Sequence, residues 1–156
     1  MNTPTRLPNL RLTLPKITSP FSRADLVFVG VEHAGPPVEV RIFFNTPDAD
    51  ESTPTTADAG FVGFFTIFGH GGCYGDDGHC DIPEQRRPND HRPAHPLTPI
   101  TKHVTVTKAV RHLAATGAQD VIVTIVPILH DVPTYVPEEL LAEPVKYQRL
   151  SIVLYE

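Results

Sequence analysis

The chain has 156 residues, the length of one ordinary domain, and its 40% hydrophobic content is enough to bury a core without disulfide bonds. Its net charge of -5, with no cluster of lysine and arginine, argues against a nucleic-acid or anionic-membrane surface. The first 19 residues have no long apolar stretch and are interrupted by three prolines. We therefore expect no signal peptide and no membrane span, and a cytoplasmic location.

Short apolar segments rich in Val, Ile and Phe predict β-strands, because each is bounded by Pro, Gly, Asn or Asp. In chain order they are Leu10–Leu14, Leu26–Val31, Val38–Phe44, Phe61–Phe68, Val121–Ile128 and Leu150–Tyr155. Apolar and polar residues alternate in the third segment, which indicates one solvated face, whereas the fifth is almost continuously apolar and belongs between covered faces. Two packed sheets satisfy both patterns. We predict a mainly β fold, an antiparallel β-sandwich of jelly-roll or immunoglobulin-like type, forming a single domain over residues 1–156.

One helix is expected near residues 105–116, where the apolar period changes from strand to helix. The residues at helical spacing are Val106, Ala109, Val110, Leu113 and Ala114. Thr105 or Thr107 can cap its amino terminus, and Gly117 follows as a stop signal. The sequence predicts a single helix of about three turns, a common length in globular domains.

Residues 69–100 show no convincing period and predict a long loop, which in a compact domain is usually functional or disordered. Its first twelve residues contain both cysteines of the chain and two of its eight histidines. These four residues are His70, Cys73, His79 and Cys80, with the spacing His-x2-Cys-x5-His-Cys. Thiolate and imidazole suit Cu(I) or Zn(II), and the glycines of the loop permit unusual backbone angles. We predict a metal site, although the spacing matches no standard zinc finger.

Two other interpretations of this loop stay open. Cys73 and Cys80 can form a local disulfide in an oxidising compartment, or they can be surface thiols without a role. Ligand softness alone does not distinguish copper from zinc.

The order of the segments resembles the carboxy-terminal β-domain of tyrosinases and polyphenol oxidases, particularly the plant domain named for its Lys-Phe-Asp-Val strand. The similar segments are Val38–Asn45, the acidic turn Thr46–Asp50, Phe61–His70 with its Gly and Phe leading into a His, Thr105–Ala115, Val121–Pro127 and Leu150–Tyr155. The resemblance runs from about Arg11 to the carboxy terminus. The loop is longer than in the plant proteins, and its cysteine pair is similar, at a different spacing, to a fungal cysteine motif linked to copper delivery.

The resemblance implies a domain that shields the dicopper site of a tyrosinase or polyphenol oxidase partner, holds it latent with an inserted side chain, and acts as a copper chaperone. It favours copper over zinc, and Tyr74 is our candidate for the active-site-blocking residue. We do not expect an enzyme, because a dicopper centre needs six imidazoles mounted on a helix bundle, and only one helix is predicted. His91 and His95 have helical spacing, but Pro93 stands between them.

Two alternatives remain. The chain can be a protein- or sugar-binding β-sandwich module with incidental cysteines. It can also be a small metal-dependent enzyme, a hydrolase or dioxygenase, that uses the loop histidines His70 and His79 with a carboxylate as ligands.

Overall fold

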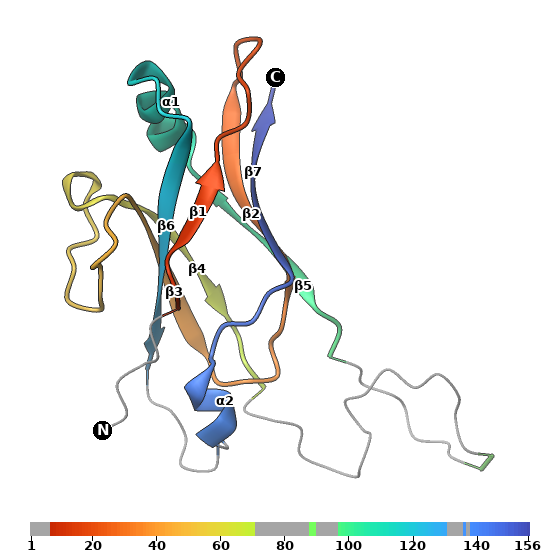
Figure 1. Ribbon diagram of the computed structural model, residues 1–156. Coiled ribbons are helices and arrows are strands. Elements are labelled where there is room, and N and C mark those ends of the chain that lie inside the picture. The colour runs from red at the N-terminus through yellow and green to blue at the C-terminus, as the bar shows by residue number, and fades with distance from the viewer. Residues whose placement is uncertain (1–6, 71–87, 90–96, 131–135, 137) are drawn as a thin grey trace.

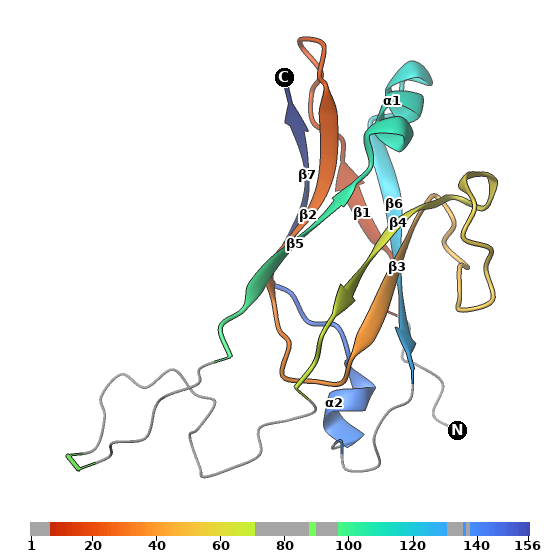
Figure 2. The same ribbon diagram turned by 180° about the vertical axis from the view of Figure 1, so that it is seen from behind.

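The computed structural model describes residues 7–70, 88–89, 97–130, 136 and 138–156. Within them the chain forms seven strands in two antiparallel sheets, which pack face to face with the core between them (Figure 1). The same two layers are seen from behind in Figure 2. The prediction of a mainly β antiparallel sandwich is confirmed.

The first sheet has four strands in the order β1-β6-β3-β4. Their bounds are Leu10–Thr13 for β1, Asp120–Leu129 for β6, Val38–Phe44 for β3 and Phe61–Ile67 for β4. The almost continuously apolar segment is β6, which pairs with β1 on one side and β3 on the other. Its burial on both faces explains why its sequence lacks alternation.

The second sheet has three strands in the order β5-β2-β7, with β5 at Ile100–Thr105, β2 at Arg23–Val31 and β7 at Arg149–Tyr155. Strand β5 was not predicted. It is an edge strand with apolar residues at only two of its six positions, Ile100 and Val104, so its alternation is too sparse to recognise. Strand β5 begins at Ile100, the last residue of the loop predicted over 69–100, so that loop ends one residue earlier than expected.

The two sheets share one apolar core. Leu26 and Phe28 from β2, Ile42 from β3 and Ile125 from β6 have no exposed surface. The Phe28 ring packs against Phe65 of β4 with a centroid separation of 4.9 Å, which joins the two sheets directly.

Helix α1 spans Thr107–Ala115 and buries Val110 and Leu113, which confirms the predicted helix. Gly117 follows its last turn with a φ of 73°, the left-handed conformation that glycine adopts readily. The predicted threonine cap is wrong, because the position before the helix is Val106 and no side chain caps it. The Thr107 hydroxyl instead accepts a hydrogen bond from the backbone N–H of Ala24, tying the helix to β2.

A second helix, α2, spans Glu138–Ala142, so the expectation of a single helix is wrong. Five residues are too few to show a helical period, which is why the sequence pattern missed it. Helices α1 and α2 lie at opposite ends of the sandwich, and a one-turn helix η1 (Ala57–Ala59) leads into β4 (Figure 1). Neither α-helix of the described chain has the length and apolar character needed to cross a bilayer.

Strand β4 is fixed against the opposite sheet by a glycine. Gly63 has a φ of 151°, and a Cβ atom built on it would lie 2.5 Å from a methyl group of Val104 in β5. The pairing of β3 with β4 shifts by one residue beside it, between Ile42 and Phe43. The bulge and the missing side chain bring the edge strands of the two sheets together.

Candidate functional site

His70 lies just beyond the end of β4, beside the connection between β2 and β3. Strands β2 and β4 run in the same direction, so both end on the α2 side of the sandwich (Figure 1). The backbone N–H of His70 donates a hydrogen bond to the carbonyl of His33, with a length of 3.0 Å. This bond fastens the start of the predicted loop to the β2–β3 connection.

The chain at Gly69 approaches that connection too closely for any side chain. A Cβ atom at this position would collide with the backbone of Gly35 and Pro36. Glycine is therefore required by space rather than by an unusual backbone angle. The contact fixes the backbone immediately before His70.

The side chains of His33 and His70 form a close imidazole pair. Their Nδ1 atoms are 3.3 Å apart, and the ring centroids are 5.0 Å apart with an interplanar angle of 60°. The Nε2 atom of His33 lies 2.8 Å from the carbonyl oxygen of Thr98. Because a carbonyl only accepts, this Nε2 carries the hydrogen and the Nδ1 of neutral His33 is left with a lone pair.

The same reasoning assigns the tautomer of His70. Its Nδ1 lies 3.1 Å from the carbonyl oxygen of His33 as well as 3.3 Å from the Nδ1 of His33. Both neighbours are acceptors, so the Nδ1 of His70 carries the hydrogen and its Nε2 has the lone pair. His33 is half-buried and His70 is exposed, so the pair is open to solvent on the His70 side.

Of the four predicted metal ligands, only His70 lies within the described residues. Cys73, His79 and Cys80 lie outside them, as does Tyr74, the predicted blocking residue. The metal site and the disulfide alternative thus stay predictions. In the part of the chain that is described, no group of three or more His, Cys, Asp or Glu side chains is close enough to hold an ion.

Sequence reasoning missed His33. The signal was present, because His33 and His70 each follow a predicted strand by two residues, and every second strand of an up-and-down order ends on the same side. The connection between β2 and β3, which contains His33, also contains Gly35-Pro36-Pro37, a sequence that marks a turn. Only His70 drew attention, because it stands near the cysteines.

A second polar feature is a buried carboxylate on β2. Asp25 is 1% exposed, and its oxygen accepts a hydrogen bond of 2.7 Å from the guanidinium of Arg23. Burial by itself raises the pKa of Asp25, but hydrogen bonds from Arg23 and Thr105, and the charges of Arg23 and His103, outweigh it and lower the pKa below its ordinary value. Asp25 therefore remains an anion at neutral pH.

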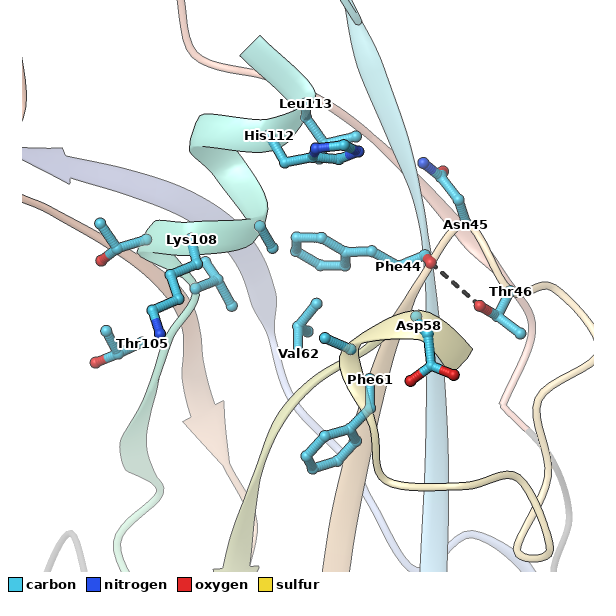
Figure 3. Close-up of a pocket in the computed structure, with 15 residues that line it drawn as sticks. Phe44, Asn45, Thr46, Asp58, Phe61, Val62, Thr105, Lys108, His112 and Leu113 are labelled. Atoms are coloured by element: carbon cyan, nitrogen blue, oxygen red, sulfur yellow. Dashed lines mark hydrogen bonds between the residues drawn. The ribbon is translucent and has the colours of Figure 1, made fainter. Parts of the chain in front are cut away.

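A groove of about 930 Å³ lies at the other end of β4, between η1, the start of β4 and α1 (Figure 3). Phe44, Val62 and Leu113 supply apolar surface, while Lys108 and His112 stand on the helix that borders it. An apolar floor with a few polar side chains at the rim is typical of small-ligand and peptide sites. The groove and the imidazole pair are separated by the length of β4.

No family model matches the chain, and no curated protein matches it in sequence. A solved structure of recombinantly expressed latent aurone synthase, a polyphenol oxidase, is similar to it with a TM-score of 0.55 and 16% sequence identity. The similarity covers 99% of this chain and 26% of that chain, so the chain spans about a quarter of the length of the structure it matches. At this identity the likeness shows the fold alone: a β-sandwich shared with a domain-sized part of a polyphenol oxidase.

Proposed function

We propose that this chain is a non-catalytic β-sandwich that works with a tyrosinase-type catalytic domain or subunit, either as a detached domain of an oxidase or as a free-standing homologue. The observation that carries the proposal is the similarity of nearly the whole chain to about a quarter of a latent polyphenol oxidase. The order of sequence segments that resembles the carboxy-terminal domain of that family supports it independently.

The first role in the proposal is to shield the dicopper site of the partner. An empty or newly loaded copper pocket exposes imidazoles and apolar surface, and a domain that binds over its entrance protects both until the site is mature. Tyr74 is the side chain that we propose to insert into the entrance. It follows His70 by four residues along the chain.

The second role is to deliver copper. Cys73 and Cys80, with His70 and His79, provide thiolate and imidazole donors for Cu(I), which would then pass to the imidazoles of the partner. Zinc suits the same donors, and the family resemblance is the reason for preferring copper. The role requires reduced thiols, so it belongs in a reducing compartment such as the cytoplasm.

Shielding is tested by adding the full chain to a polyphenol oxidase catalytic unit expressed without its β-domain, and measuring phenol oxidation against chain concentration. We expect saturable inhibition that Tyr74→Ala weakens. Tyr155→Ala is the matched control, because Tyr155 is an exposed tyrosine at the last-but-one position of the chain. Unchanged oxidation at concentrations where the two proteins bind would exclude shielding.

Delivery is tested separately, by adding the Cu(I)-loaded chain to the copper-free catalytic unit and following the return of activity. We expect faster activation than with free Cu(I), and no such acceleration by the Cys73→Ser, Cys80→Ser double variant. Equal acceleration by the double variant would exclude delivery and leave shielding intact.

The groove favours a second candidate function, a module that binds a protein segment or a sugar. Its distinguishing property is that binding depends on the groove and not on the loop. A ligand lost with Val62→Arg and retained with Tyr74→Ala would support the module. The metal-dependent enzyme stays a sequence prediction, because His79 lies outside the described residues.

A further inference from the structure

We propose that His33 and His70 form a metal site of their own, which takes an imidazole-preferring divalent cation, Cu(II) or Zn(II), between their Nδ1 atoms. The site goes beyond the proposed function, because it uses a residue outside the predicted ligand set and needs neither cysteine. Both of its ligands belong to the described part of the chain.

The spacing of the two nitrogen atoms fits a shared ion. Imidazole nitrogens bind Zn(II) at about 2.0–2.1 Å, and two such ligands on a tetrahedral ion are about 3.3–3.4 Å apart. The Nδ1 atoms of His33 and His70 are 3.3 Å apart. An ion bound to both would lie to one side of the line that joins the two nitrogens, so each ring must turn until its Nδ1 lone pair points at that position.

The surroundings of His33 are those of a metal ligand. Its Nε2–H donates to the carbonyl of Thr98 at 2.8 Å, which fixes the tautomer with the lone pair on Nδ1. Histidines that bind metals usually donate their other N–H to a carbonyl or carboxylate, and this bond orients the ring. Thr98 thus positions the ring of His33.

The backbone holds the two histidines together before any ion binds. The N–H of His70 donates to the carbonyl of His33 at 3.0 Å, and the contact of Gly69 with Gly35 and Pro36 fixes the preceding residue. Little conformational freedom of the backbone is left to lose on binding. A preorganised pair of ligands binds more tightly than the same pair on free loops.

Metal binding requires the hydrogen on Nδ1 of His70 to move, and no other reactant is needed. In the empty pair one hydrogen lies between the two Nδ1 atoms, bound to His70. On metal binding the N–H bond at Nδ1 of His70 breaks, a nitrogen–metal bond forms, and the proton passes through water to Nε2 of the same exposed ring. The proton stays on the same ring, and no electron is transferred.

The test uses the full chain with Cys73→Ser and Cys80→Ser, so that thiolates contribute nothing. We titrate this protein with Cu(II) and with Zn(II) by calorimetry and record the nitrogen couplings of bound Cu(II) by electron paramagnetic resonance. We expect two coupled nitrogens, and a loss of affinity of at least about 10-fold with His33→Gln or His70→Gln, because the loss of an outer-shell partner alone typically costs about 10–100-fold. Glutamine is chosen at position 33 because its side-chain amide can still donate toward the carbonyl of Thr98. The midpoint of urea unfolding shows whether each variant is folded.

His112→Gln is the matched control, since His112 is an exposed histidine at the other end of the molecule. It should leave affinity and couplings unchanged. Equal affinity with His33→Gln, or Cu(II) bound without two coupled nitrogens, would overturn the site. If the thiol-free protein binds Cu(II) but the Cu(I)-loaded wild-type chain does not accelerate activation of the catalytic unit, the delivery role is refuted and the imidazole site stands.

Discussion

The two ends of β4 are built on different principles. At the α1 end, side chains form a groove with an apolar floor, in which Phe44 and Leu113 are also members of the buried core. At the α2 end, Val31 and Ile67 are also buried, and beyond them the backbone at Gly69 contacts the β2–β3 connection, where the two imidazoles lie edge to face. The first end therefore presents an apolar surface, and the second presents two imidazole side chains that are available for binding.

The largest expected loss of stability is at the α1 end of β4, where the groove lies. Phe44→Ala removes a ring that is 6% exposed and lies between the core and the groove, so we expect a loss of about 3–5 kcal/mol in the free energy of unfolding. Phe64→Ala is the matched control, because Phe64 is 56% exposed, and we expect a change of about 0.5 kcal/mol or less. Urea unfolding measures both. Similar losses for the two variants would show that burial of the Phe44 ring contributes nothing specific to stability.

The next largest expected loss is at the α2 end of β4, where the backbone contact of Gly69 can be removed. Gly69→Ala places a methyl group against the backbone of Gly35 and Pro36, and we expect a loss of about 1–3 kcal/mol together with weaker Cu(II) binding by the imidazole pair. Gly35→Ala tests the same contact from its open side, where the nearest atom to an added Cβ is 3.9 Å away. It should be tolerated in both urea unfolding and calorimetry. A harmless Gly69→Ala would mean that the close approach does not position His70.

The apolar content of each element decides whether the sequence predicts it. Buried strands such as β3 and β6 carry enough Val, Ile and Phe to fix their position from pattern alone. Edge strand β5 and the five-residue α2 carry too few apolar residues for a period to be recognised. Thr107 was expected to cap a helix, but its hydroxyl is bonded to β2, a partner that no local pattern contains.

The candidate site divides in the same way. His70 was predicted because it is near Cys73 along the chain. His33 precedes His70 by 37 residues and contacts it only because of the topology of β2, β3 and β4. The sequence supplies ligand chemistry, and the pairing of strands decides which ligands meet. Local spacing alone therefore predicted one half of the imidazole pair.

Asp25 gives a smaller effect, which depends on pH. Its lowered pKa means that the folded state prefers the carboxylate, so its contribution to stability is present above the ordinary pKa of 3.8 and is lost as the pH falls through the lower folded value. Asp25→Asn should cost roughly 1 kcal/mol at pH 7, and the difference from wild type should shrink below pH 3.8. Unfolding free energies measured across this range check the sign. A difference that grows on acidification would contradict the lowered pKa.

The smallest expected effects are those of substitutions at the polar rim of the groove. Lys108 and His112 line the groove but are exposed, so Lys108→Ala and His112→Ala should each change the free energy of unfolding by about 0.5 kcal/mol or less. If the groove binds a ligand, the same substitutions should change affinity for charged ligands while Phe44→Ala lowers stability itself. Urea unfolding with and without ligand separates the two. A rim variant as damaging as Phe44→Ala would show that the polar rim, and not the apolar floor, stabilises this end of β4.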